Sequence, residues 1–187
     1  MWWARLLNIV AGLLNGAGAP ASTNSYESIS TVTVGAGGVS SISFSSIPST
    51  YKHLQIRAIA NASVQSRLRM QFNSDTGNNY AVHYLQGSGS AASAVGAANY
   101  NQFGLALTNA DANIFTASVV DILDYANTSK YKTGRILSGY DKNGSGEMDF
   151  QSGVWMNTAA VSTITMYFDS SATTTQYSHF ALYGIKG

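Results

Sequence analysis

The feature that most constrains the fold is a two-residue period of apolar side chains, which recurs along the chain from residue 26 onward. Ile42 and Phe44 alternate with serines in SSISFSS, and Leu54 and Ile56 alternate with polar residues in HLQIRAIA. The segments RLRMQF and TITMYF show the same pattern. Successive side chains of a β-strand point to opposite faces of its sheet, so this period predicts strands that are buried on one face.

Turn-forming clusters separate these segments, among them GAGG, NSDTGNN and DKNGSG. The chain has 18 glycines and only two prolines, a composition typical of short strands joined by tight turns. We expect about ten or eleven strands, arranged as an antiparallel, jelly-roll-like β-sandwich over residues 25–187. The weakly charged segment GSGSAASAVGAANYN (residues 87–101) predicts a long surface loop, the least regular part of the domain.

Charge and cysteine content exclude several kinds of partner and chemistry. Only 10% of the residues are charged and the formal net charge is +1, so no overall field attracts nucleic acid. Because 45% of the residues are hydrophobic, the low charge does not indicate disorder. The absence of cysteine excludes disulfides and thiolate metal sites. A surface with so little charge is typical of a chain that is partly covered by copies of itself or by other proteins.

The first residues, MWWARLLNIVAGLLNGAGAPAS, differ from the rest because their apolar side chains follow a helical period. A secretory signal is one interpretation, using Arg5 and the small residues of AGAPAS. A membrane span is excluded by length, because residues 1–14 would extend about 21 Å as a helix, against a hydrocarbon core of about 30 Å. The third interpretation is a docking helix over residues 1–15, followed by a linker over residues 16–24.

The docking helix is the favoured interpretation, because its apolar arc is too wide to be left in water. The arc consists of two adjacent rows, and these hold the residues expected to contact other chains: Trp2, Trp3, Leu6, Leu7, Ile9, Val10, Leu13 and Leu14. It is broader than the seam of a two-stranded coiled coil. We therefore expect a homo-oligomer, with a trimer as the simplest arrangement and docking into another shell protein as the alternative.

Six segments of the body carry a family resemblance: SYESISTVTVGAGGVSSISFSSIPSTYKHLQIR, FNSDTGNNYAVHYLQG, DILDYANTSKYKT, NGSG, SGVWMNT and FALYGIKG. Together they resemble a domain common at the C-terminal ends of bacteriophage virion proteins, notably tail-fibre and capsid-fibre proteins. The resemblance implies a β-sandwich on the surface of a phage particle, often oligomeric, with other virion proteins as partners. A host surface glycan is the candidate ligand. Residues 1–24 lie outside the resemblance.

No catalytic group is expected. The three histidines are far apart in sequence, and neither a nucleophile elbow nor an HExxH zinc motif occurs. Asp121 and Asp124 are the candidate carboxylate pair, but their spacing on a strand puts them on opposite faces. We expect them instead to end a strand and to receive Lys130 or Lys132 across a hairpin.

The segment DKNGSGEMDF has part of the spacing of a calcium-binding loop, with Asp141, Asn143 and Ser145 at its first, third and fifth positions. The bidentate glutamate that such a loop needs at its twelfth position is absent. The favoured interpretation is therefore a hairpin turn at the Asn-Gly dipeptide. Glu147 and Asp149 keep calcium as the alternative. We expect the domain to need no metal and no other cofactor.

Three arginines and four tyrosines are the candidate ligand-binding residues. Arg57 lies on one predicted strand and Arg67 and Arg69 on the next, so pairing of these strands would bring the arginines together on one outer face. Such a site would bind an acidic sugar or a partner's carboxylate, but the favoured interpretation is pairing with acidic residues within the chain. Trp155 is expected in the core. The tyrosines that could stack on a sugar ring are Tyr80, Tyr84, Tyr100 and Tyr140.

The leading hypothesis is a phage structural protein without enzymatic activity, located at the particle surface. Its first residues would dock it, and its sandwich would be displayed outward as an adhesive or decorating module. The alternative is a soluble carbohydrate-binding, lectin-like domain. A secreted hydrolase is the third hypothesis.

Overall fold

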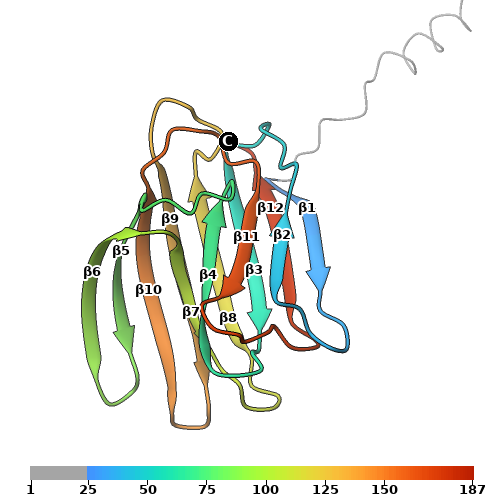
Figure 1. Ribbon diagram of the computed structural model, residues 1–187, viewed down its shortest axis with the longest axis vertical. Coiled ribbons are helices and arrows are strands. Elements are labelled where there is room, and N and C mark those ends of the chain that lie inside the picture. Colours follow the sequence, from blue (N-terminus) through green and yellow to red (C-terminus); the bar gives the residue numbers. More distant parts are fainter. Residues whose placement is uncertain (1–24) are drawn as a thin grey trace, which may run out of the picture.

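The computed structural model describes residues 25–187, which form twelve β-strands in two antiparallel sheets (Figure 1). The predicted helix over residues 1–15 and the linker over residues 16–24 lie outside the described residues. Within residues 25–187, no helix is long and apolar enough to cross a membrane. In chain order the strands are β1 (Tyr26–Thr33), β2 (Ser41–Phe44), β3 (His53–Ala60), β4 (Ser66–Phe72), β5 (Tyr80–Gly87), β6 (Ala92–Tyr100), β7 (Phe103–Thr108), β8 (Thr116–Leu123), β9 (Lys132–Asp141), β10 (Gly146–Trp155), β11 (Ile164–Phe168) and β12 (His179–Ile185).

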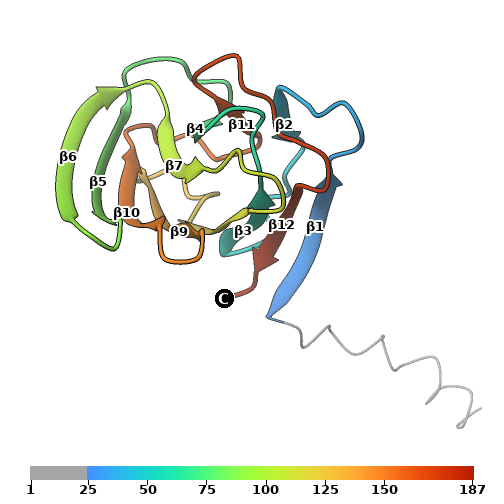
Figure 2. The same ribbon diagram turned by 90° about the horizontal axis from the view of Figure 1, so that it is seen from below.

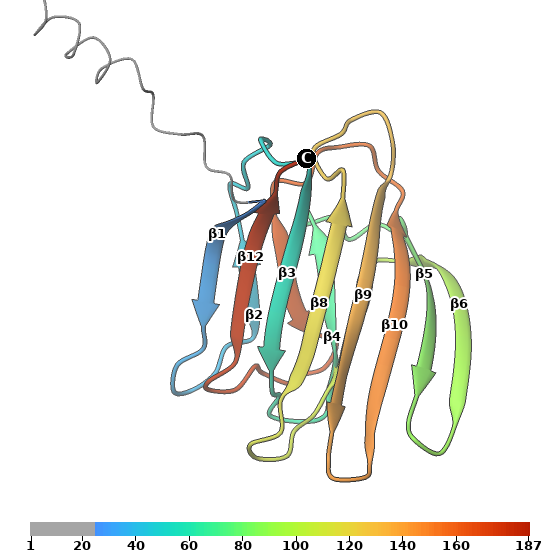
Figure 3. The same ribbon diagram turned by 180° about the vertical axis from the view of Figure 1, so that it is seen from behind.

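Eight of the strands have the connectivity of a jelly roll. The strands β1, β12, β3 and β8 lie side by side in the eight-stranded sheet, and β2, β11, β4 and β7 form the four-stranded sheet. Along the chain, β1 to β4 lie in alternate sheets, and β11 and β12 later insert beside β2 and β1 (Figures 1 and 3). The predicted all-β, antiparallel jelly-roll-like sandwich is therefore confirmed.

Two inserted hairpins widen the larger sheet beyond this eight-strand frame. The hairpin β9–β10 follows β8, and the hairpin β5–β6 follows β4, yet the two meet because β10 pairs with β5. The eight-stranded sheet thus continues past β8 in the order β9-β10-β5-β6. Seen along the strands, this added part curves beyond the edge of the four-stranded sheet (Figure 2).

The core lies between the facing sides of the two sheets. In β2 and β11 the predicted alternation is confirmed, since Ile42, Phe44, Ile164 and Met166 are buried and their neighbours are more exposed. Trp155 is buried as expected, and its indole Nε1 donates a hydrogen bond to Asp75 Oδ2 in the β4–β5 turn.

An aromatic cluster fills the centre of this core. Phe103 packs edge-on against Phe72 and Tyr80, with ring centroids 5.2 and 5.0 Å apart. Trp155 also packs edge-on against Phe72, at 5.5 Å. Edge-to-face pairs at these distances are favourable, so the cluster fixes β10 and β5 of the larger sheet against β4 and β7 of the smaller.

Two predictions about the strands are wrong. Residues 87–101, expected to be a surface loop, contain β6, a regular edge strand whose small side chains gave no alternating signal. The strands β3 and β4, whose pairing as a hairpin is the hypothesis behind the arginine site, belong to different sheets, because the segment between them crosses the sandwich.

Candidate binding surface

An unbroken row of apolar side chains crosses the outer face, which is the solvent side of the eight-stranded sheet. The register pairs Leu85 with Phe150, Phe150 with Leu137, and Leu137 with Val119. These four residues, the apolar row, are 59%, 54%, 51% and 37% exposed, respectively. Contiguous exposed apolar surface is uncommon on a soluble monomer and marks an interaction site.

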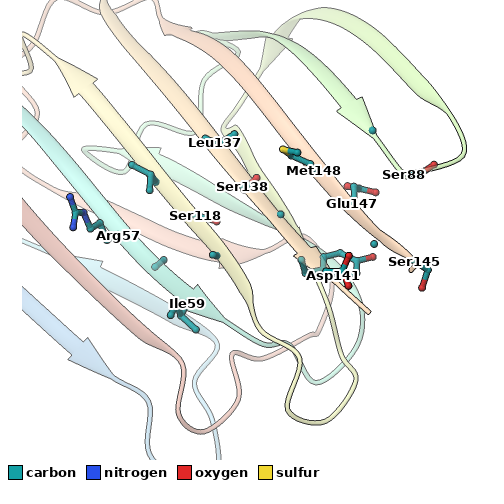
Figure 4. Close-up of a pocket in the computed structure, with 18 of the residues that line it drawn as sticks. Arg57, Ile59, Ser88, Ser118, Leu137, Ser138, Asp141, Ser145, Glu147 and Met148 are labelled. Carbon is teal, nitrogen blue, oxygen red and sulfur yellow. The ribbon is translucent and has the colours of Figure 1, made fainter. Parts of the chain in front are cut away.

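The next row toward the β9–β10 turn has large apolar side chains only at its two ends. Met148 and Ile59 are exposed, and Gly139 and Ala117 lie between them in register. These two small residues leave a hollow of about 900 Å³ over the sheet (Figure 4). The lining also includes Arg57, Leu137 and Asp141 from strands of the eight-stranded sheet. Ser88 from the β5–β6 turn and Ser145 from the β9–β10 turn complete it.

A polar row runs beside the apolar row on the same face. It crosses five strands in register through His83, Ser152, Arg135, Asp121 and Gln55. Gln55 donates from Nε2 to Asp121 Oδ1 at 2.7 Å, and Arg135 donates to Ser152 Oγ. The outer face therefore has an apolar strip and a hydrogen-bonded polar strip side by side.

Arg57 and Tyr140 are the predicted ligand-binding residues that line the hollow. The guanidinium carbon of Arg57 lies 5.8 Å from the ring centroids of both Tyr26 and Tyr183. Its Nε donates to Gln55 Oε1 at 2.9 Å, so this nitrogen is already used. The remaining guanidinium donors and the flanking rings form a combination suited to an anion or a hydroxyl-rich ligand.

The other two arginines lie elsewhere, so the predicted convergence of three arginines is wrong. Arg67 and Arg69 belong to β4 in the four-stranded sheet. Arg67 contacts Asp149 at 3.0 Å and Glu147 at 3.4 Å. Arg69 pairs with Asp169, which follows β11. Burial raises the pKa of the Glu147 carboxyl, and the charge of Asp149 raises it further. The favoured interpretation, pairing within the chain, is confirmed for Arg67 and Arg69.

The segment proposed as a calcium loop forms the β9–β10 hairpin turn. Asn143 has a φ of 57° and the following glycine a φ of 100°, as predicted for an Asn-Gly turn. Asp141 and Ser145 line the hollow on the outer face, whereas Glu147 and Asp149 contact Arg67 of the opposite sheet. Within residues 25–187, no three acidic or histidine side chains are grouped closely enough to hold a metal ion.

Asp121 and Asp124 have separate roles. Asp121 belongs to the polar row, whereas Asp124 follows β8 and contacts Lys130 and, at 2.8 Å, Lys52. Hydrogen bonds from these two lysines lower the pKa of Asp124 to about 2. The predicted pairing with Lys130 is confirmed, whereas Lys132 is buried and donates to backbone carbonyl oxygens.

The four candidate tyrosines do not form one site. Tyr80 is fully buried in the aromatic cluster, and burial raises its pKa. Tyr100 lies opposite it in register and is exposed on β6. Tyr84 packs near the guanidinium of Arg67, with 5.7 Å between the guanidinium carbon and the ring centroid. Of the four, Tyr140 alone lines the hollow.

Sequence reasoning missed the apolar row, although the sequence contains a signal for it. In VVDIL and RIL, apolar residues occupy consecutive positions, so Val119 stands beside Val120 and Leu137 beside Ile136. Successive residues of a strand point to opposite faces of the sheet, so a strand with large apolar residues at consecutive positions is apolar on both faces. In a two-layer sandwich, one of these faces is the outer face, and such strands therefore indicate an outer surface suited to contact.

Comparisons with known proteins do not assign the chain to a family. No protein-family model matches the sequence. No curated protein matches it either. Among solved structures, the chain is similar to the galectin LEC-6 of Caenorhabditis elegans, with 12% sequence identity, a TM-score of 0.29, and coverage of 86% of this chain and 98% of that chain. A similarity of this size carries no conclusion about ligand or function.

Proposed function

We propose that this chain is a structural and binding protein of a bacteriophage particle, of the tail-fibre, capsid-fibre or decoration type, and that it acts without catalysis. The resemblance of its six segments to phage virion domains supports this function. The jelly-roll connectivity also supports it, because viral capsid proteins commonly use this fold. Since one fold hosts many functions, the proposal depends more on the surface than on the connectivity.

The observation that carries the proposal is the apolar row on the outer face. Its side chains come from four neighbouring strands, and the polar row beside them is held by hydrogen bonds within the chain. Covering apolar surface recovers about 25 cal/mol for each Å² removed from water. A face with this composition suits contact with another protein of the particle or with a host surface component.

Attachment to the particle is assigned to residues 1–15. These residues lie outside the described residues, so their docking role and the homotrimer inferred from it remain predictions. The sandwich over residues 25–187 would then be the displayed part, and the particle surface its location.

The test is whether the protein is a regular component of purified particles. Virus particles from the source of the sequence are banded on a density gradient and analysed by mass spectrometry, and antibodies against the sandwich are used for gold labelling. We expect its peptides to follow the major capsid protein at a constant ratio, with label on intact particles. Recovery of the protein only in the soluble lysate fraction would overturn the proposal.

A soluble lectin-like domain is the second candidate, because the guanidinium of Arg57, which lines the hollow, lies 5.8 Å from the ring centroids of both Tyr26 and Tyr183. Aromatic rings beside a planar hydrogen-bonding group are suited to a sugar ring. A glycan array with the wild-type protein and with Arg57→Ala tests this candidate. Arg135→Ala is the matched control, because it removes the same charge from the same face. Binding that Arg57→Ala loses and Arg135→Ala keeps would favour the lectin, and an array without binding would count against it.

A further inference from the structure

The two sheets have four edge strands, and three of them have features that prevent pairing with another chain. β1 has a bulge between Ser28 and Ser30, and its Glu27 pairs with Lys186 at 3.0 Å. β2 is only four residues long. β7 is almost entirely buried against the larger sheet. Short strands, bulges, charges and cover are the usual means by which proteins protect sheet edges.

β6 lacks these features along most of its length. It is nine residues long and contains neither a charged residue nor proline. Eight of its residues are exposed and the ninth is half-buried. Its register with β5 is regular from Ala92 to Ala97, and an irregularity occurs only toward the Tyr100 end. The strand stands at the free edge of the eight-stranded sheet (Figures 2 and 3).

The side of β6 that faces away from β5 carries backbone N–H and C=O groups with no strand partner within residues 25–187. An extended strand carries a donor and an acceptor at each residue, and only half of them point toward its one neighbour. A second strand is the partner that satisfies such a row. The geometry of the backbone therefore determines that the occupant is a strand.

We propose that β6 pairs antiparallel with β6 of a second copy of this chain, so that two eight-stranded sheets join across a two-fold axis. Such an interface is isologous, and like charges facing each other would oppose it. β6 has none. With the axis at Ala94, Ala92 lies opposite Gly96 and Ser93 opposite Val95, and these side chains are small enough for close approach.

The composition of the outer face favours a second copy of this chain, rather than a strand of another protein, as the partner of β6. Ala94 is in register with Leu85, the first residue of the apolar row, which continues through Phe150. A two-fold axis at Ala94 perpendicular to the sheet keeps both outer faces on the same side. The apolar rows of the two copies then become one continuous band, which a foreign strand would not supply. This inference does not depend on the proposed phage function.

Cysteine cross-linking of the full chain tests the pairing directly, because the wild-type sequence has no cysteine. Residues directly opposite each other in an antiparallel pair have Cα atoms about 4.5–5.5 Å apart, within the range that a disulfide spans. Under mild oxidation, Ala94→Cys should form a covalent dimer at least tenfold faster than Ser90→Cys. The control position lies in the turn of the same hairpin, outside the strand.

A charge placed on the edge provides an independent measurement. Sedimentation velocity of wild type, Ala94→Lys and Ser90→Lys is compared between roughly 1 and 100 µM, the range in which a micromolar complex dissociates. We expect Ala94→Lys to weaken at least tenfold the association step made by β6, apart from any assembly made by residues 1–15, and Ser90→Lys to leave that step unchanged. Circular dichroism checks that each variant keeps its β-sheet content.

Two outcomes would overturn the inference. One is cross-linking of Ala94→Cys at no more than the Ser90→Cys rate. The other is that Ala94→Lys forms the same largest species as wild type over the same concentrations, which would place every contact between copies, including any made by residues 1–15, outside β6. If Ala94→Lys fails to fold, the cysteine series still decides, because replacing alanine by cysteine adds no charge to the strand.

Discussion

Replacing Arg67 with methionine would measure the contribution of the ion cluster that joins the two sheets. Methionine keeps an apolar chain of similar length but leaves Asp149, which is 2% exposed, without the cation that lies 3.0 Å away. Removing one partner of a buried ion pair typically costs about 3–5 kcal/mol. The Arg67 side chain is 20% exposed, which weakens the pair, so we expect a loss of about 2–3 kcal/mol in the free energy of unfolding.

Urea unfolding of the full chain, followed by circular dichroism at pH 7, measures this loss. Arg69→Met is the matched control, because it removes the same side chain from the same strand while its partner Asp169 is 40% exposed. For a pair of that exposure we expect about 0–1 kcal/mol. The double variant Arg67→Met/Asp149→Asn should recover part of the loss, since it removes the unpaired charge. Equal losses in Arg67→Met and Arg69→Met would refute the reasoning.

Four further predictions concern other parts of the chain. Because folding raises the pKa of Glu147, this group contributes stability at low pH that is lost as the pH rises through its folded pKa. Glu147→Gln should therefore reduce the fall in urea midpoint over that pH range. A profile of urea midpoint against pH that Glu147→Gln leaves unchanged would contradict the assignment to Glu147. Gly153→Ala places a Cβ 2.4 Å from a ring atom of Phe103 and should cost about 1–3 kcal/mol by urea unfolding, whereas Gly87→Ala, with no atom within 4 Å, should have little effect. Deleting residues 1–14 should leave the circular dichroism of the sandwich intact but abolish incorporation into particles, and incorporation at full occupancy would exclude the docking role. Chelation should leave the melting temperature unchanged within about two degrees, and a larger drop would support a calcium site in DKNGSGEMD.

The sequence predicts the strands that are buried on one face, because such burial leaves a two-residue period of apolar side chains. That period identified β2, β3, β4 and β11 and the class of fold. It does not say which sheet a strand joins, since an inward-facing residue looks the same in either layer. The predicted pairing of β3 with β4 failed for this reason, and the proposed arginine site failed with it.

The candidate surface was less predictable than the core, for two physical reasons. Small residues such as Ala94 and Gly96 give no apolar signal in either register, so an edge strand exposed on both faces resembles a loop. The apolar row is formed by strands that are distant along the chain, with Leu85 and Phe150 brought together only by the pairing of two separate hairpins. The alternation in HLQIRAIA correctly predicted that Arg57 is exposed on the outer face. It could not predict the neighbours Tyr26 and Tyr183, because these belong to the first and last strands.

The insertion of β12 between β1 and β3 has a consequence for the synthesis of the protein. β1 pairs only with β12, and β2 pairs only with β11, so each N-terminal strand needs a partner translated near the end of the described chain. Neither sheet can be completed while these last strands are still within the ribosome. Contacts of such long sequence separation make folding slow and leave unpaired strands exposed meanwhile. We expect that β1 and β2 stay unpaired until β11 and β12 have left the ribosome, so that both sheets are completed late in folding.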